Sequence, residues 1–270
     1  GGYGVQTYYP EAPYMLSANT AWLAVNHTHP PLDDPEFRKA LAWAIDVPTI
    51  VDVVYTGIVA PASPTGLLPT WEQFEDQAVV DELGFSYDPE MAASLLAEAG
   101  YVDNDGDGFV ENLAGEPFQL ELIVPNGWTD WMESIRVIAE SGKAVGIDIQ
   151  TAFPDYGART DAIHQGTFDL AIVNDKQMSN TPWDYYNYLF RLPIQDVQNT
   201  ENFGRYENQE AYDLVQQLDL TPVDDIEGMQ AITSQLQQIS LTDMPMIPLW
   251  YNGAWSQVSP AVWTNWPSDG

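Results

Sequence analysis

Residues 168–173, FDLAIV, give the most direct indication of the fold. Beyond the aspartate, this segment is a continuous apolar run without polar alternation. Such runs are typical of strands buried on both faces, in sheets that helices cover on both sides. A short helical pattern, residues 158–165, precedes the run and ends at Gly166. The segment therefore predicts a strand that follows a helix inside an α/β sheet.

Strand and helix signals alternate in both directions from this segment. Further strands are predicted at residues 20–26 (TAWLAVN), 118–125 (FQLELIVP), 147–153 (IDIQTAF) and 244–251 (MPMIPLWY). Helices are predicted at residues 131–146, 209–218 and 226–239. Three more begin where an aspartate is followed within two residues by a proline, at Asp34, Asp46 and Asp88. This order predicts an α/β fold with a mixed or parallel sheet flanked by helices.

The composition of the 270-residue chain limits the classes of partner. Apolar residues make up 45% and aromatic residues 12%, which is enough for a buried core. Forty acidic residues against eight basic ones give a formal charge of -32, which repels phosphate backbones and anionic lipid. We therefore expect no nucleic-acid partner. The acidic residues are scattered along the chain, as in a solubility or salt adaptation of the surface.

Absent motifs narrow the chemistry. The chain has no cysteine, which excludes disulfides, thiolate catalysis and Cys-ligated zinc. It contains no nucleophile elbow, phosphate-binding glycine loop or dinucleotide fingerprint. Carboxylate pairs of the glycosidase type are uninformative, because 40 acidic residues bring some pairs together by chance. We expect no enzyme activity, and a glycoside hydrolase is the less favoured alternative.

Residues 103–111, DNDGDGFVE, form the sharpest local motif. Aspartates alternate from its first position and Gly108 is the sixth, as at the start of a calcium loop. The twelfth position, where a bidentate glutamate is expected, is Ala114. The candidate ligands of a structural calcium ion are Asp103, Asp105, Asp107 and Glu111. The alternative is a tight turn, because Asp, Asn and Gly also cap their own backbone.

The ten tryptophans suggest a stacking surface. Trp128 and Trp131 flank a predicted helix start, and Trp183 lies in the polar segment 174–186, NDKQMSNTPWDYY, which we interpret as a loop. Four more lie in the last 21 residues: Trp250, Trp255, Trp263 and Trp266. An indole ring offers a flat apolar face and an N–H donor, which suits a sugar. The alternative is core packing, which we expect for about half of them.

Four stretches together resemble the family 5 solute-binding proteins of ABC transporters, the dipeptide, oligopeptide and oligosaccharide class. They are residues 26–57 (NHTHPPLDDPEFRKALAWAIDVPTIVDVVYTG), 87–109 (YDPEMAASLLAEAGYVDNDGDGF), 145–150 (VGIDIQ) and 244–253 (MPMIPLWYNG). Their order and spacing agree with that family over roughly residues 15–255. The resemblance implies one lobe of a periplasmic-binding-protein-like fold, in a protein whose two lobes close on a ligand.

The same resemblance implies a division of the chain. Residues 1–14 would lead in from a first lobe that this chain lacks, residues 15–255 would form the substrate-binding lobe, and residues 256–270 would return toward the first lobe. The opening GGYGVQTYYPEAPYMLS has neither a start methionine nor a signal peptide. We therefore expect a fragment of a longer protein that is extracellular or periplasmic, lipid-anchored through a region absent here.

In peptide-binding relatives, the region after the strand that corresponds to residues 168–173 resembles the pattern Gly-Trp-x-Ala-Asp-Tyr-x-x-Pro. The aspartate of this pattern holds the peptide's amino group. Aligned on Pro182, this chain has Met178 in the aspartate's position. A thioether cannot pair with an ammonium ion, and a buried charge without a partner is costly. Ser179, Asn180 and Trp183 offer neutral hydrogen-bonding groups beside a ring instead. This segment therefore looks like the oligosaccharide-binding branch.

The resemblance predicts an extracellular component of an ABC importer. It would capture a short β-linked oligosaccharide of the gluco, manno or xylo type and deliver it to a membrane permease. The predicted ligand-binding residues are Trp128, Asn174, Asn180, Trp183, Trp250 and Asn252. Asp175 and Asp184 could instead contact an amine, which keeps an oligopeptide or dipeptide ligand as the alternative. Apart from the candidate calcium ion, we expect no cofactor.

Overall fold

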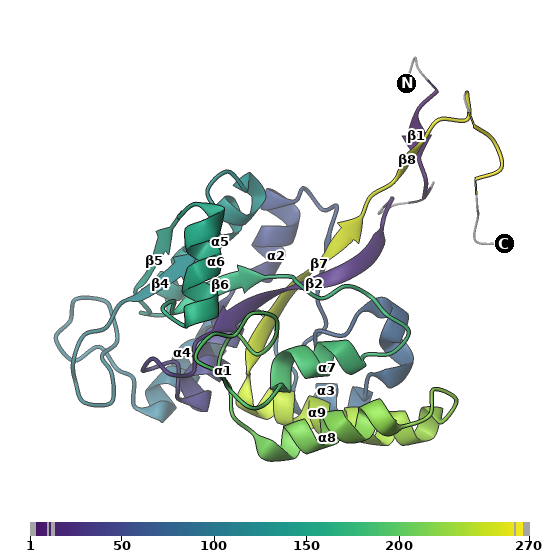
Figure 1. Ribbon diagram of the computed structural model, residues 1–270. Helices are drawn as coiled ribbons and strands as arrows, with labels where there is room; N and C mark the ends of the chain where they lie inside the picture. Colours follow the sequence, from purple (N-terminus) through teal and green to yellow (C-terminus); the bar gives the residue numbers. More distant parts are fainter. Residues whose placement is uncertain (1–3, 10, 12–13, 262, 267–270) are drawn as a thin grey trace.

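The computed structural model describes residues 4–9, 11, 14–261 and 263–266, and a long antiparallel pair of strands lies at its centre (Figure 1). Strand β2 (Leu16–Val25) pairs with β7 (Met246–Ala254), although more than 200 residues separate them. Two β-bulges interrupt the ladder. Ala18 is the extra residue on β2, and Leu249 is the extra residue on β7.

Four more strands complete a mixed sheet in the order β3-β7-β2-β6-β4-β5. Their bounds are β3 Ala60–Pro61, β4 Leu120–Ile123, β5 Ile149–Ala152 and β6 Leu170–Val173. β6 runs antiparallel to β2, whereas β4 is parallel to both β6 and β5. The predicted mixed α/β sheet is therefore confirmed, and FDLAIV forms an inner strand, as expected.

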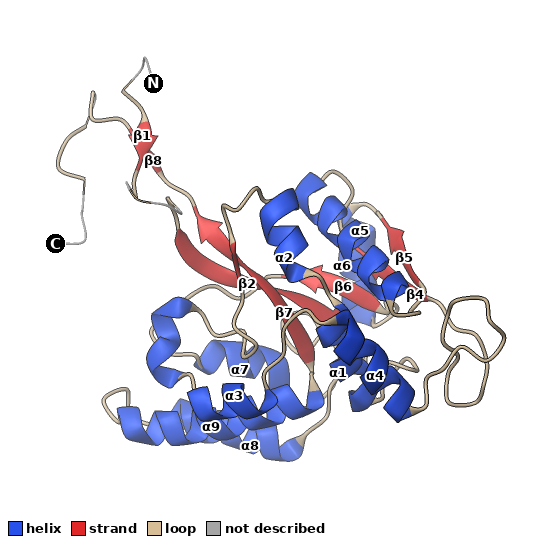
Figure 2. Ribbon diagram, turned by 180° about the vertical axis from the view of Figure 1, so that it is seen from behind, coloured by secondary structure: helices blue, strands red, loops and turns tan. Residues whose placement is uncertain are grey.

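Helices cover both faces of this sheet (Figure 2). The first face packs against α1 (Pro35–Ala44), a π-helix (Ile50–Val54) that continues α2 (Val47–Thr49), α4 (Pro89–Ala99) and α5 (Thr129–Ala144). The second packs against a 3-10 helix (Pro69–Phe74), α6 (Tyr156–Gln165), α7 (Trp183–Phe190), α8 (Gln209–Leu220) and α9 (Ile226–Asp243). Helix α3 (Gln77–Leu83) lies against α9. Alternate residues of β2 therefore enter two separate cores.

The predicted helix starts are confirmed by their caps. The side chains of Asp34, Asp46 and Asp88 each accept a hydrogen bond from a backbone N–H in the first turn that follows. At the other end, α4 and α6 stop at Gly100 and Gly166, which adopt left-handed backbone angles with φ of 94° and 70°. These boundaries depend on local chemistry, and local sequence was enough to place them.

One segment differs from its sequence-based interpretation. Residues 174–186 were interpreted as a loop, but α7 begins at Trp183. Its N-cap is Pro182, which provides no side-chain hydrogen bond, so the usual start signal is missing. The helix is instead stabilised by burial of Tyr185, Tyr186 and the other aromatic rings that follow. Tertiary packing decides its conformation.

The two ends of the chain leave the sheet together. Short strands β1 (Gln6–Thr7) and β8 (Gln257–Val258) pair antiparallel in a ribbon that points away from the body (Figure 1). The expected boundaries at residues 14/15 and 255/256 stay a prediction, and residues 1–3, 10, 12–13, 262 and 267–270 lie outside the described residues. Among the described helices, none combines the length and apolar character needed to span a bilayer.

Arg38 links α1 to the turn between α9 and β7. It is only 3% exposed, and its guanidinium donates to the carbonyl oxygens of Leu32 at 2.8 Å, Asp243 at 2.6 Å and Met244 at 3.1 Å. Burial lowers the pKa of Arg38 from its ordinary value, while nearby carboxylates, mainly Asp243, oppose this. One buried cation therefore donates hydrogen bonds to the carbonyl oxygens of the turn that leads from α9 into β7.

We predict that Arg38→Met lowers the free energy of unfolding by about 2–4 kcal/mol, because buried carbonyl groups would lose their donors. Urea denaturation followed by circular dichroism measures the change. The control is Arg136→Met, whose exposed guanidinium pairs with Glu133 and lies over Phe153; it should cost less than about 1 kcal/mol. Equal losses in the two variants would contradict the structural role of Arg38.

Candidate functional site

The candidate site lies at the carboxyl ends of the parallel strands. β4 is followed by α5, which packs on the first face, and β5 is followed by α6, which packs on the second. This follows from the strand order, because right-handed crossovers that run in opposite directions across a sheet place their helices on opposite faces. After β4 and after β5, the chain therefore turns toward opposite faces of the sheet. Such switch points are where open α/β sheets bind ligands.

Two exposed aromatic rings lie at this switch point. Trp128 precedes α5 and is 40% exposed; Tyr156 opens α6 and is 59% exposed. Their ring centroids are 5.8 Å apart with an interplanar angle of 31°. The buried ring of Trp131 supports Trp128 edge-on at 4.8 Å. Trp128 was predicted and Tyr156 was missed, although Asp155, a helix-capping residue, directly precedes it and marks the helix start.

The loop after β6 lies along the start of β2. The backbone N–H of Met178 donates to the carbonyl oxygen of Ala18 at 2.7 Å, and this oxygen belongs to the bulged residue of β2. Trp71 Nε1 donates to the carbonyl oxygen of Ser179 at 2.9 Å. Backbone contacts thus anchor the loop, while Asn174 is half-buried and Asn180 exposed. Both predicted asparagines therefore belong to the carboxyl edge of the sheet.

Trp183 is partly buried. Its ring packs partly against the second core, and its Nε1 is buried without a hydrogen-bond partner among the described residues. An indole N–H in that state favours a partner from outside, since leaving it unpaired carries a desolvation cost. Its role as a ligand residue stays a prediction.

The prediction for Trp250 needs correction. Its ring is completely buried in the first core, 5.2 Å from the ring of Tyr55, so it offers no stacking surface. Its Nε1 donates to Asn252 Oδ1 at 2.8 Å, and Asn252 Nδ2 donates to Asn19 Oδ1 at 2.8 Å. Asn19 Nδ2 in turn donates to Gln177 Oε1 at 3.2 Å in the loop after β6. Trp250 therefore belongs to the core and donates one hydrogen bond to this amide chain.

The amide chain brings two unpredicted residues to the edge. Asn252 is half-buried, whereas Asn19 is buried and Gln177 exposed. Asn19 was missed because it directly precedes the predicted strand 20–26, whereas β2 begins earlier, at Leu16. The chain presents uncharged donors and acceptors beside the anchored loop.

The carboxylates near this loop are occupied. Asp184 accepts from Lys176 Nζ at 3.1 Å, and Asp175 accepts from the Tyr188 hydroxyl at 3.1 Å. The guanidinium of Arg159 donates to the carbonyl oxygen of Ile172 close by. Burial lowers the pKa of Arg159, and the charge of Asp175 opposes this shift. Position 178 itself carries a partly buried thioether in contact with the second core.

The acidic turn supports both of its interpretations. Carboxylate oxygens of Asp103, Asp105 and Glu111 can lie within 4.8 Å of one another, and Glu111 is buried. The same groups also cap the turn: Asp103 accepts from two backbone N–H groups, and Glu111 accepts from the backbone and side chain of Asn104. The grouping does not include the fourth candidate, Asp107, which accepts from the N–H of Phe109. Calcium binding stays a prediction.

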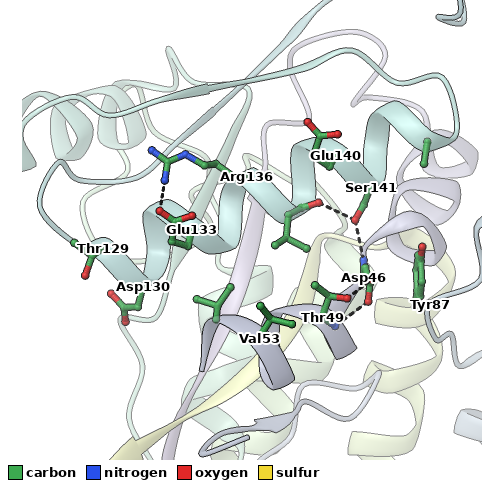
Figure 3. Close-up of a pocket in the computed structure, with 13 residues that line it drawn as sticks. Asp46, Thr49, Val53, Tyr87, Thr129, Asp130, Glu133, Arg136, Glu140 and Ser141 are labelled. Carbon is green, nitrogen blue, oxygen red and sulfur yellow. Dashed lines mark hydrogen bonds and ion pairs between the residues drawn. The ribbon is translucent and has the colours of Figure 1, made fainter. Parts of the chain in front are cut away.

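A separate pocket of about 710 Å³ lies between the π-helix and α5 (Figure 3). Its lining reaches the carboxyl edge only near Thr129, next to Trp128. Many of its polar groups already pair with one another: Asp46 with Thr49, Arg136 with Glu133, and Ser141 with the backbone (Figure 3). We therefore place the candidate site at the ring pair, which is exposed.

Solved structures and curated relatives resemble this chain over most of its length. A Thermotoga maritima periplasmic oligopeptide-binding protein of an ABC transporter, solved with bound mannohexaose, is 43% identical with a TM-score of 0.91. The match covers 99% of this chain and 50% of that one. The oligopeptide-binding protein AppA of Bacillus subtilis is 26% identical, with 87% of this chain and 42% of AppA covered. The periplasmic oligopeptide-binding protein OppA of Escherichia coli is 25% identical, with 88% of this chain and 40% of OppA covered.

This chain thus spans about half the length, or less, of the relatives it matches. Residues 5–194, well over half of the chain, match the profile of the bacterial extracellular solute-binding proteins, family 5, in its middle region. The chain belongs to the bacterial extracellular solute-binding proteins of family 5.

Proposed function

We propose that this chain forms the ligand-binding lobe of an ABC-importer component that captures a short, uncharged oligosaccharide. The observation that carries the proposal is the exposed pair of Trp128 and Tyr156 at the switch point. A pair of tilted rings fits the flat apolar faces of consecutive sugar units. Amides of Asn174, Asn180 and Asn252 would meet the hydroxyl groups. A second lobe would close over the ligand and deliver it to a membrane permease.

The chemistry of the loop supports a neutral ligand. Met178 offers no charge at the position that the resemblance gives to the aspartate of peptide-binding relatives. The two nearby aspartates already accept hydrogen bonds from Lys176 and Tyr188. The bound mannohexaose of the Thermotoga maritima protein, the relative with 43% identity, agrees with this assignment.

A peptide ligand is the second candidate. The names of the curated relatives favour it, because AppA and OppA are called oligopeptide-binding proteins. The site geometry favours it less, since a peptide's ammonium group needs a carboxylate that is free. We propose transport without catalysis, and a location outside the cytoplasm with a lipid anchor supplied by another part of the protein.

Calorimetry on the complete protein that contains this lobe should separate the two ligands. We expect mannohexaose or a β-1,4 glucan hexamer to release heat on binding, because rings and amides match hydroxylated, uncharged surfaces. Di- and tripeptides with a free amino group should give no signal. Tight peptide binding without a sugar response would reject the proposed ligand class.

The contribution of stacking can be measured by substitution. Trp128→Ala should weaken oligosaccharide binding by about 1–3 kcal/mol, the range found for aromatic platforms under stacked bases. Tyr212→Ala is the matched control, because this half-buried ring on α8 contacts Arg191 and lies on another part of the lobe. An unchanged dissociation constant in Trp128→Ala would exclude the ring pair as the binding surface.

We also propose that the acidic turn binds calcium as a structural ion. Adding Ca²⁺ after chelation should raise the melting temperature by about 3–8 °C, because the ion stabilises only the folded turn. Asp105→Asn removes one charge but can still accept from the N–H of Asp107, so it should abolish the shift without unfolding the turn. Mg²⁺ serves as the control for general screening, and an equal shift with Mg²⁺ would argue against a specific site.

A further inference from the structure

We propose that Lys176 determines the preference of this site for uncharged ligands by neutralising the acidic groups behind the binding loop. The inference rests on the proposed function, because it concerns selection at the same site. Without a cation at this position, the loop would present free carboxylates, and ligands that carry an ammonium group would be favoured.

Lys176 is held between two carboxylates. Its Nζ lies 3.1 Å from a carboxylate oxygen of Asp184 and 3.3 Å from one of Glu201. Its side chain is only 16% exposed, while those of Asp184 and Glu201 are 34% and 24% exposed. The ammonium also lies 5.8 Å from the ring centroid of Tyr188. These contacts hold the side chain of Lys176 in place within the loop after β6.

The position of this cluster connects it to the ligand. Lys176 is two residues from Asn174 and two from Met178, within the loop that the bulge at Ala18 anchors. Asp184 directly follows Trp183 in the first turn of α7. The neutralised carboxylate is thus the neighbour of a predicted ligand residue. A change of charge here acts on the carboxyl edge at short range.

A second basic residue lies near Asp175, the other aspartate of this segment. Arg159 is buried and lies close enough to Asp175 for the two charges to influence each other. The Tyr188 hydroxyl donates to Asp175 as well, so Tyr188 contacts both parts of the cluster. Two of the eight basic residues in the chain therefore lie next to carboxylates of this one loop region.

The overall charge explains why such local neutralisation matters. A formal charge of -32 produces a negative potential that concentrates cations at the surface, and clefts strengthen this effect. A site with two free carboxylates in that field would collect cationic ligands and ions in preference to a sugar. Lys176 removes this competition by supplying the cation internally. It disfavours the wrong class of ligand without touching the right one.

The test compares two hexamers that differ only at one group on each ring. Cellohexaose is neutral, and the β-1,4 glucosamine hexamer replaces each 2-hydroxyl with an amine that is protonated in mildly acidic buffer. Calorimetry on the complete protein gives the ratio of the two dissociation constants. The wild-type protein should prefer the neutral hexamer. In Lys176→Met this ratio should shift by about tenfold toward the amine, the size expected for a partly buried charge pair.

Three further variants isolate the cause. Lys143→Met removes the same charge from an exposed position on α5 and should leave the ratio unchanged. Lys176→Arg should keep the wild-type ratio, because it keeps the cation. The double variant Lys176→Met with Asp184→Asn should reverse most of the shift. Melting temperatures show that each variant is folded, and Lys176→Arg supports the assignment if Lys176→Met is unstable.

The outcomes separate this inference from the proposed function. If the wild-type protein binds the neutral hexamer and Lys176→Met shows the same ratio as Lys143→Met, Lys176 has no selective role while sugar binding stands. If the wild-type protein binds neither hexamer but Lys176→Met acquires affinity for the amine, the ligand class is wrong and the role of Lys176 is supported. Absence of binding in every variant rejects both.

Discussion

The pairing of β2 with β7 is the constraint on which the rest of the structure depends. It joins segments from the two ends of the chain at the centre of the sheet. The chain between them must therefore begin and end beside this pair of strands. Alternate side chains of β2 enter both cores, and helices from all parts of the sequence pack on one or the other. Because β2 extends beyond the end of β6, it also provides the surface along which the loop after β6 lies.

The two bulges in this pair have different consequences. The bulge at Leu249 breaks the alternation of β7, so that Trp250 joins Leu249 in the first core instead of facing the second with Met246. The bulge at Ala18 leaves a carbonyl oxygen that accepts the N–H of Met178. One irregularity therefore buries a tryptophan, and the other fixes the loop that forms one side of the candidate site.

These features explain which parts were predictable from sequence. The starts of helices α1 and α4 could be placed to within a residue, because their aspartate caps act on neighbouring residues alone, and the glycine stop of α4 is equally local. Helix α7 and the burial of Trp250 could not, since a helix without a cap depends on its packing and a bulge leaves no mark in the residue pattern. Trp128 was predicted from its ring chemistry, whereas its partner Tyr156 required knowledge of which strand ends meet.

The switch point places the two rings on rigid elements, and this matters for the ligand class. Trp128 and Tyr156 stand at the starts of α5 and α6, and Trp131 fixes the first ring from below. Rigid rings lose little conformational entropy when a ligand stacks on them. The first turn of α5 receives no side-chain cap from Trp128, whereas Asp155 caps α6. The first backbone N–H groups of α5 therefore lack a side-chain cap beside the ring, which agrees with the proposal of a hydroxylated, uncharged ligand rather than one with an ammonium group.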